Sequence, residues 1–340
     1  MRVVASVHFA APHRMAGSET MLHTMMRSVA EAGHEAHVVV SDLPDAPPTW
    51  EYQGVTGHSR RGVAEATRFL RQLRPDVIVT HHQNAIQGIM EARRLGVQSV
   101  FIQHNSFGLN RQILALRPDL TVFNTEWIKA MWGQQAGRSI VIHPPVRADD
   151  HATTPGNHVT LINLNRHKGV DLFYRLARHF PHQPFLGVHG GHGQQIVHGA
   201  PPNVRIIPQT NNMRDDVWAR TRVLLVPSVY ESYGMVAAEA LCSGIPVMAN
   251  ATPGLQECLG AAGIWPGGVR AVTQPVPSNI VHTSAGALAQ WVAILRRLLT
   301  DHEEWERVSA VCRQRSAELA PGPEMARWVA ELEAMAPAKA

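Results

Sequence analysis

Residues Leu224 to Ala249 read LLVPSVYESYGMVAAEALCSGIPVMA and predict a strand, a turn, a helix and a second strand. The run Val223–Val226 is apolar and β-branched and ends at Pro227, which is typical of a buried parallel strand. Gly244 stands where the helix would end, and Ile245–Ala249 begins the next strand. Such a unit places its turn at the carboxyl edge of a parallel sheet, where open α/β folds bind ligands. The start of the helix favours an anion such as a phosphate.

Two carboxylates belong to this segment, Glu231 in the turn and Glu239 in the helix. Eight residues of helix rise about 12 Å, whereas a retaining glycosidase holds its two carboxyl groups about 5 Å apart. We therefore expect each glutamate to accept hydrogen bonds from hydroxyl groups at a different part of one extended ligand. The alternative for Glu239 is a solvated helix residue. Its neighbours are nearly all apolar, which favours a buried carboxylate that needs polar partners.

The stretch ESYGMVAAE, from Glu231 to Glu239, resembles the E-x7-E signature of retaining glycosyltransferases of family 4, also called glycosyl transferases group 1. The resemblance covers nearly the whole chain. It implies an α/β fold of GT-B architecture, in which two Rossmann-like domains face each other across a cleft. Family members usually have Pro-Phe where this chain has Ser232–Tyr233, and the loss of the proline predicts a looser turn.

The chain alternates short apolar runs with helical patterns, as expected for two parallel sheets. We expect an acceptor-side Rossmann-like domain over residues 1–145, a hinge over 146–158 and a nucleotide-sugar-binding domain over 159–320. Residues 321–340 predict a C-terminal helix, which the resemblance implies crosses back to the first domain. The expected strands are Val3–Val7, Ala36–Val40, Val77–Thr80, Ser99–Gln103, Leu120–Asn124, Ser139–Ile142, Val159–Leu164, Phe185–Val188, Val204–Ile207, Val223–Val226 and Pro246–Ala249. The clearest expected helices are Thr20–Ala32, Val170–Phe180, Ser284–Thr300, His302–Leu319 and Glu324–Met335.

Composition is that of a globular protein: 340 residues, of which 45% are hydrophobic and 17% charged. No stretch approaches the ~20 apolar residues that span a membrane. The apolar run VVASV after Arg2 predicts a first strand rather than a signal peptide. Three widely spaced cysteines predict free thiols in a reducing cytoplasm. The net charge of +4 is scattered, so an acidic or nucleic-acid acceptor stays open beside an ordinary solvated surface.

Two short stretches predict contacts to a donor diphosphate. Gly17 and Ser18 lie between the first strand and the first helix, where Ser18 can cap the helix and Gly17 allows backbone to approach a phosphate. A plain helix cap explains the same residues, and Gly17 is assigned because the resembled family has a Gly-rich loop there. Arg166 and Lys168 follow Val159–Leu164 and can neutralise a diphosphate through charge-assisted hydrogen bonds. A solvated basic loop is the alternative.

The resemblance assigns the remaining donor contacts to the second domain. The backbone amides of the turn would hold the distal phosphate and the sugar; these residues are Ser232, Tyr233, Gly234, Met235 and Val236. Glu239 would bind the ribose hydroxyls and Glu231 a hydroxyl of the donor sugar. Asn212 follows Val204–Ile207 and would border the nucleotide base.

Histidines follow two expected strands of the first domain, His81 and His82 after Val77–Thr80 and His104 after Ser99–Gln103. All three would face a cleft from the carboxyl edge of the sheet. The resemblance implies that His104 touches the transferred sugar, where a neutral imidazole could donate a hydrogen bond or stabilise developing charge. Hydrogen-bonded core histidines are the alternative. Neither an HExxH pattern nor a D-x-D carboxylate pair occurs, so we expect no metal and no cofactor.

The sequence gives little information about the identity of the acceptor. Acceptors should meet the first domain, whose segment Ser41–Gly62 carries Trp50, Arg60 and Arg61 among turn-forming residues. Aromatic faces could stack on a sugar or a base, and the arginines could meet phosphate or carboxylate. An ordinary exposed loop explains the segment equally well. Lipid-linked, small-molecule, protein and DNA acceptors all stay open, as does the oligomeric state.

Taken with the resemblance, these residues predict a retaining glycosyltransferase that moves a sugar from a UDP- or GDP-sugar to an acceptor hydroxyl. Catalysis would depend on orientation and on stabilising the departing diphosphate. Three alternatives stay open: a DNA-modifying glycosyltransferase that acts on a hydroxylated base, a nucleotide-sugar epimerase, and a non-catalytic sugar-nucleotide binding protein.

Overall fold

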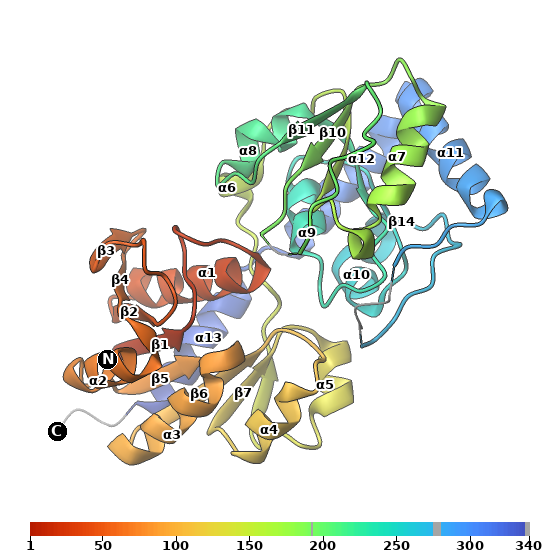
Figure 1. The fold of residues 1–340 in the computed structure, drawn as a ribbon. Coiled ribbons are helices and arrows are strands. Elements are labelled where there is room, and N and C mark those ends of the chain that lie inside the picture. Colours follow the sequence, from red (N-terminus) through yellow and green to blue (C-terminus); the bar gives the residue numbers. More distant parts are fainter. Residues whose placement is uncertain (192, 275–279, 337–340) are drawn as a thin grey trace. The chain divides into compact units, whose positions relative to one another are not determined.

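The chain folds into two compact units, seen in a computed structural model that describes residues 1–191, 193–274 and 280–336. The first unit contains Met1–Pro145 together with the C-terminal segment that begins at Pro321. The second unit is Val146–Ala320. Each unit is a parallel sheet covered by helices (Figure 1), and the α/β fold expected from the sequence is confirmed.

The first unit has an eight-stranded sheet in the order β3-β4-β2-β1-β5-β6-β7-β8. Every neighbouring pair is parallel except β3 with β4. The strands are β1 (Arg2–Val7), β2 (Glu35–Val40), β3 (Thr49–Tyr52), β4 (Val55–Ser59), β5 (Val77–Thr80), β6 (Gln98–Gln103), β7 (Leu120–Phe123) and β8 (Ser139–Val141). The helices are α1 (Gly17–Glu31), α2 (Gly62–Gln72), η1 (His82–Asn84), α3 (Ala85–Leu95), α4 (Leu109–Ala115), α5 (Glu126–Trp132) and α13 (Gly322–Met335).

The central strands of this sheet are continuous hydrophobic runs because both of its faces are buried: Val4 points to one face, and its neighbours Val3 and Ala5, also buried, point to the other. The register of the strands places the two clusters below on the face of Val4. Strands β1, β2 and β5 pack against α2 and α3 through one buried cluster: Val4, Val39, Ala66, Leu70, Ile78 and Ala92. Strands β6, β7 and β8 pack against α3, α4 and α5 through another, which includes Phe101, Ile113, Phe123, Ile128 and Val141. Covering both faces keeps the backbone of a parallel sheet out of water.

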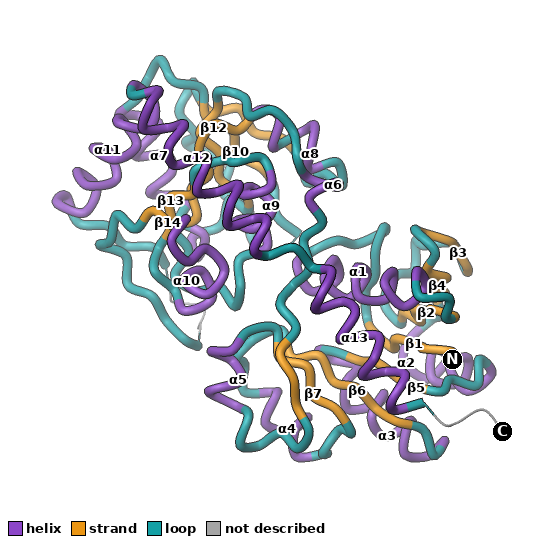
Figure 2. The backbone as a smooth tube through the Cα atoms, turned by 180° about the vertical axis from the view of Figure 1, so that it is seen from behind, coloured by secondary structure: helices purple, strands orange, loops and turns teal. Residues whose placement is uncertain are grey.

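The last described helix belongs to the first unit. Helix α13 lies alongside α1 (Figure 2), and the buried Trp328 donates its indole Nε1–H to the carbonyl of Met25, at 3.1 Å. Glu324 accepts hydrogen bonds from the backbone N–H and the ring of His143, both at 2.7 Å. Residues 337–340 of the expected terminal segment lie outside the described residues.

The segment Ser41–Gly62, for which the sequence left both an acceptor-binding segment and an ordinary exposed loop open, contains the β3–β4 hairpin. Gln53 and Gly54 form its two-residue turn, with φ values of 49° and 80°, and two left-handed residues are typical of a hairpin turn of type I′. Gly57 has no side chain because the ring of Trp50 lies against its backbone: an added Cβ would be 2.0 Å from Trp50 Cε2. The hairpin was not predicted, because Gln-Gly is a weaker turn signal than Asn-Gly.

The second unit has a six-stranded sheet in the order β11-β10-β9-β12-β13-β14, parallel throughout. The strands are β9 (His158–Ile162), β10 (Phe185–Val188), β11 (Val204–Ile207), β12 (Thr221–Val226), β13 (Val247–Ala249) and β14 (Gly263–Ile264). The helices are α6 (Ala148–His151), η2 (Arg166–Lys168), α7 (Val170–His179), α8 (Met213–Asp216), η3 (Trp218–Arg220), α9 (Met235–Cys242), α10 (Pro253–Leu259), η4 (Gly260–Ala262), α11 (Ala285–Thr300) and α12 (His302–Glu318). The expected strands of both units are present, with ends shifted by at most two residues.

Two details of the second unit correct the sequence analysis. The supposed hinge over residues 146–158 is not irregular throughout, because it contains α6 and the first residue of β9. Strand β14, which pairs with β13, was not predicted because it contains only Gly263 and Ile264. Among the described residues, no helix combines the length and apolar character that crossing a bilayer requires.

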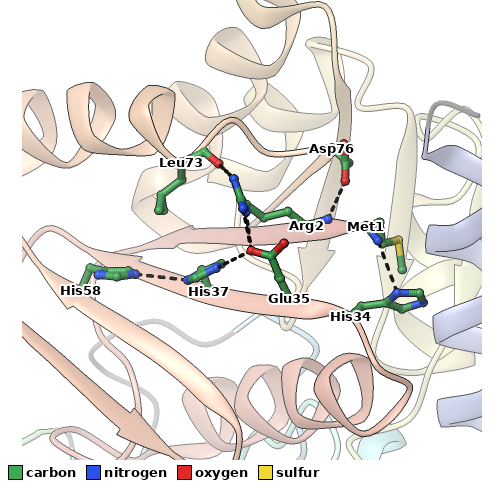
Figure 3. Close-up of polar contacts among 8 residues, drawn as sticks. All are labelled: Met1, Arg2, His34, Glu35, His37, His58, Leu73 and Asp76. Atoms are coloured by element: carbon green, nitrogen blue, oxygen red, sulfur yellow. Dashed lines mark hydrogen bonds and ion pairs between the residues drawn. The ribbon is translucent and has the colours of Figure 1, made fainter. Parts of the chain in front are cut away.

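Titratable side chains form a chain of contacts across β1, β2 and β4 (Figure 3). The Nε–H of Arg2 donates to Glu35 Oε2 at 2.7 Å, and Nε2 of His37 lies 3.6 Å from the same oxygen. The opposite ring nitrogen of His37 is 3.2 Å from Nε2 of His58. Burial, with smaller contributions from His37 and the positive charge of Arg60, lowers the pKa of His58 from 6.5 to about 4. His58 is therefore neutral in the folded protein at pH 7.

We predict that the first unit loses stability as the pH falls from 6.5 towards 4. In that interval the unfolded chain binds a proton at His58 that the folded chain does not bind, so stability is complete above pH 6.5 and decreases below it. The measurement is the urea concentration at half-unfolding from pH 7.5 to 4.5. His58→Gln should flatten the curve, whereas His13→Gln, at an exposed position, should not. Parallel curves for the wild type and His58→Gln would contradict the assignment.

Candidate functional site

The order of strands reverses at one place in each sheet. In the second unit the chain runs from β9 outward through β10 to β11 and returns as β12 on the other side of β9. In the first unit it runs from β1 to β2 and β4 and returns as β5 on the other side of β1. Loops that leave neighbouring strands in opposite directions open a crevice at the carboxyl edge, and open α/β folds bind ligands there.

The loop after β9 is shaped by two residues beside Lys168. The Asn165 side chain accepts a hydrogen bond from the backbone N–H of Lys168, at 2.9 Å. Gly169 has a φ of 90°, and a Cβ there would lie 2.5 Å from Cγ of Pro227, the residue that follows β12. Only glycine fits this left-handed position with so little space. The loops after β9 and β12 are therefore in direct contact.

Lys168 and Glu231, both predicted site residues, meet across these two loops. The Nζ of Lys168 donates to Oε1 of Glu231, and the hydroxyl of Ser228 donates to the same oxygen at 2.8 Å. The backbone N–H of Val229 also donates to the carbonyl of His167, at 3.0 Å. The Lys168 side chain is 28% exposed and that of Glu231 is 13% exposed. An ammonium group is thus held at the edge of the sheet, half-buried beside a carboxylate.

The predicted turn leads directly into α9. Gly234 is the N-cap, with a φ of 103°, and Tyr233 beside it is buried. A Cβ on Gly234 would lie 2.6 Å from Cδ2 of Leu255, so α10 packs closely against the turn. The first turn of α9, which begins with Met235 and Val236, has N–H groups that lack intrahelical partners, as every helix start does.

Glu239 lies one turn further along α9 and is only 6% exposed. Burial raises the pKa of its carboxyl group, and His151 and Trp218 oppose that rise. The Nδ1 of His151, from α6, lies 3.8 Å from Oε2 of Glu239, yet neither atom has a hydrogen-bond partner among the described residues. The burial expected for Glu239 is present. A buried carboxylate oxygen without a partner is costly unless a ligand or water binds it.

Arg166 and Asn212 are the other two predicted donor residues of this unit. Among the described residues, the side chains of both have partners other than Lys168 and Glu231. The Arg166 side chain is 58% exposed, with its Nε 3.9 Å from Asp171. Asn212 caps α8, accepting a hydrogen bond from the backbone N–H of Asp215 at 3.4 Å. The capping bond of Asn212 is a structural role, and the guanidinium group of Arg166 lies largely in solvent beside Asp171.

In the first unit the three predicted histidines come together. His81 and His82 follow β5, and His104 follows the neighbouring strand β6. The Nδ1 of His81 lies 2.8 Å from Nε2 of His104, and the ring centroids of His82 and His104 are 5.1 Å apart. Burial is the main cause that lowers the pKa of both His81 and His104 well below the usual range, with nearby histidines adding to it. Both rings are neutral at pH 7.

Ser18 does not cap α1, contrary to expectation. The helix begins at Gly17 rather than Thr20, its N-cap is Ala16, and no side chain caps it. The Ser18 hydroxyl instead donates to Oε1 of Glu19, at 3.1 Å. The prediction was wrong because the helix starts three residues early, which moves Gly17 and Ser18 from a loop into the first helical turn.

The predicted acceptor-side residues do not gather in one place. Trp50 lines a small pocket of the first unit together with Tyr52, His23 and Glu19. Arg60 stacks on the ring of Phe69, with its guanidinium carbon 3.6 Å from the centroid, and donates to the carbonyl of Pro48. Arg61 is exposed, and its backbone N–H donates to Glu65. The two arginines are not among the residues that line this pocket.

Sequence reasoning missed three residues that contact the predicted site. Ser228 lies in the quoted segment three residues before Glu231, so its spacing could have identified it. His8 follows β1 and lies beside the histidine group, with its ring centroid 5.6 Å from that of His82; a search for histidines after every strand would have found it. His151 lies in the supposed hinge, where no sequence signal links it to Glu239.

Two family models match parts of the chain. The model of Glycosyltransferase Family 4 matches residues 15–150. A second model, described as Family 4 Glycosyltransferase in conflict systems, matches residues 195–326. The chain belongs to glycosyltransferase family 4.

One curated relative is D-inositol 3-phosphate glycosyltransferase of Xylanimonas cellulosilytica. It is 30% identical to this family 4 chain over 161 residues, which are 44% of this chain and 35% of the relative. The match thus spans about a third of the length of that protein.

Solved structures establish the fold of this family 4 chain as GT-B. HepE of Anabaena, in complex with UDP and glucose, has a TM-score of 0.73 at 14% identity, covering 98% of this chain and 100% of that one. The pneumococcal O-GlcNAc transferase GtfA, in complex with UDP and GlcNAc, has a TM-score of 0.73 at 9% identity, with coverage of 98% and 99%. Trehalose-6-phosphate synthase OtsA has a TM-score of 0.65 at 13% identity, with coverage of 99% and 100%.

We predict that Gly254→Ala destabilises the second unit by about 1–3 kcal/mol, the usual cost of overpacking. A Cβ at Gly254, in the first turn of α10, would lie 2.4 Å from the carbonyl oxygen of Ser232 and 2.5 Å from that of Glu231. The matched control is Gly286→Ala in α11, where a Cβ meets nothing within 4 Å and the greater helix propensity of alanine favours the folded state. The measurement is the midpoint temperature of thermal unfolding for both variants and the wild type. Equal midpoints for both variants would contradict close packing of α10 on the turn.

Proposed function

We propose that this family 4 protein is a retaining glycosyltransferase that moves a sugar from a UDP- or GDP-sugar to an acceptor hydroxyl without needing a metal. One observation carries the proposal: Lys168 and Glu231 meet where the strand order of the second sheet reverses, beside the start of α9. A half-buried ammonium group, a helix N-terminus and a carboxylate suit a ligand that carries both phosphate and hydroxyl groups.

The donor diphosphate carries negative charge, which Lys168 and Arg166 bind. As the bond to the sugar breaks, the departing diphosphate gains negative charge, which the two cations and the N–H groups at the start of α9 stabilise. The turn residues Ser232 to Val236 contribute those N–H groups. Glu231 accepts a hydrogen bond from a hydroxyl of the donor sugar. Lys168 then exchanges part of its contact with Glu231 for one with phosphate.

Glu239 binds the ribose hydroxyls in this proposal. Its Oε2 atom is buried and has no hydrogen-bond partner among the described residues, so a hydroxyl donor would remove an energetic penalty. His151, 3.8 Å away, is placed to neutralise the carboxylate. Gly17 and Ser18 on the first unit, and Asn212 near the base, complete the proposed donor contacts.

His104 donates a hydrogen bond from Nδ1 to the transferred sugar. The reason lies in the tautomers of the His81–His104 pair. The Nε2 of His81 is buried and has no partner among the described residues, and a buried N–H without a partner costs more than a bare lone pair. The proton of His81 therefore resides on Nδ1 and points to Nε2 of His104. His104 then carries its own proton on Nδ1.

Retention follows from attack on the face from which the diphosphate departs. In this mechanism the leaving phosphate accepts the proton of the acceptor hydroxyl, and no protein carboxylate acts as base. The enzyme contributes orientation and electrostatic stabilisation. The UDP in the structures of HepE and GtfA supports UDP as the donor nucleotide, and the three free cysteines agree with a cytoplasmic location.

A nucleotide-release assay tests the function. The purified protein is incubated with UDP-glucose, UDP-GlcNAc and GDP-mannose, each without acceptor, with a polyol acceptor such as inositol phosphate, or with hydroxylated duplex DNA. Release of UDP or GDP that depends on acceptor and persists in EDTA is expected, with an α-anomeric product by NMR. A donor epimer formed without acceptor would establish the epimerase instead. Nucleotide binding without release under any condition would establish the non-catalytic binding protein.

We predict that Lys168→Ala weakens UDP binding about 10- to 100-fold, because a hydrogen bond to a charged group contributes about 1.5–3 kcal/mol. Loss of the ammonium also leaves Glu231 to repel phosphate. The matched control is Lys129→Ala, a lysine of α5 in the first unit. Isothermal titration calorimetry measures both dissociation constants. An unchanged affinity for Lys168→Ala would remove this residue from the donor site.

A further inference from the structure

Three histidines form a compact group at the carboxyl edge of the first sheet. One ring nitrogen each from His81, His82 and His104 lies within 4.8 Å of the other two. Zinc bonds to histidine nitrogen are about 2.0–2.1 Å long, which separates two tetrahedral ligand atoms by about 3.3 Å. Nδ1 of His81 and Nε2 of His104 already lie 2.8 Å apart. The group contains nitrogen ligands alone and no carboxylate.

The backbone of the first unit fixes this geometry. Strands β5 and β6 are parallel neighbours, with Thr80 paired to Phe101, so the residues that follow them lie at the same edge. His82 has a φ of 49°, a left-handed conformation that histidine seldom adopts. That conformation turns the chain from β5 into η1 and keeps two consecutive histidines on the same side as His104. A costly backbone conformation at such a place often accompanies a functional role.

The chemistry of the rings suits a metal. His81 is fully buried, and its Nδ1 lies 2.8 Å from Nε2 of His104, so that these two ring nitrogens face the same point. Histidine binds a metal through a lone pair of the neutral ring. His82 is half-buried, which gives an ion a route from solvent. Three histidines with one open position are a known ligand set for zinc.

We propose that His81, His82 and His104 bind a divalent transition-metal ion such as Zn²⁺, Co²⁺ or Ni²⁺. Imidazole ligands favour these ions over Mg²⁺ and Ca²⁺, which need oxygen ligands. The site therefore differs in kind from one that bridges the phosphates of a nucleotide sugar. It goes beyond the proposed transfer, which needs no metal. The ion would replace the proton between Nδ1 of His81 and Nε2 of His104. His81 would then carry its proton on Nε2, and His104 would keep the N–H at Nδ1 for a sugar.

Cobalt binding tests the site on the full-length protein without any donor. Co²⁺ bound by three histidines gives visible absorption bands, and Zn²⁺, which binds more tightly in the usual order of affinities, should abolish them. We expect one Co²⁺ per chain. His82→Asn and His104→Gln should each weaken binding at least about tenfold, since even residues behind metal ligands have effects of that size. Asparagine tolerates the left-handed backbone of His82.

Controls separate this site from adventitious binding by the other histidines. His302→Gln, at an exposed position of α12, should retain the wild-type affinity and stoichiometry. Circular dichroism checks that each variant is folded. If the buried variant His104→Gln unfolds, the comparison of His82→Asn with the wild type still tests the site. A UDP titration of the same samples reports separately on the donor site of the second unit. Absence of a one-to-one complex, or equal affinity of the wild type and both ligand variants, would overturn the proposal.

Discussion

The donor site proposed in the second unit depends on the close approach of two loops, those that follow β9 and β12. Gly169 has no side chain, so the chain leaving β9 can press against Pro227 at the end of β12. That contact brings Lys168 to Glu231, and it allows the backbone of Val229 to bond with that of His167. A larger residue at this left-handed position would separate the loops. The charge pair thus depends on an uncharged residue next to it.

Both units contain buried polar atoms whose hydrogen-bonding capacity is not used within the described chain. Oε2 of Glu239 and Nε2 of His81 are examples, one in each unit, and both lie near the reversal of strand order. Proteins satisfy nearly all of their buried polar groups. Such atoms therefore mark places where stability has been given up, and a bound partner would recover it. The two atoms differ in chemistry, since a carboxylate carries a negative charge whereas the lone pair of a neutral imidazole does not.

Much of the fold and part of the site could be predicted from the sequence. Continuous apolar runs identified the central strands, and the rule that parallel strands end at one edge anticipated the meeting of Lys168 with Glu231 and of His81 with His104. The contact of His151 with Glu239 could not be predicted, because 88 residues separate them and no periodic pattern connects α6 to α9. The early start of α1 had no signal either, since alanine at the N-cap is an unfavoured residue. Local patterns thus located elements, whereas contacts between distant side chains needed the assembled sheet.

The attachment of α13 to the first unit has a consequence for biosynthesis. The unit is discontinuous: residues that complete it are separated from the rest by the whole second unit. During translation the ribosome releases β1 to β8 before α13, so the surface of α1 that receives Trp328 stays uncovered until α13 has been made. The second unit, being continuous, can acquire its native structure earlier. The domain that begins first is therefore the one that matures last.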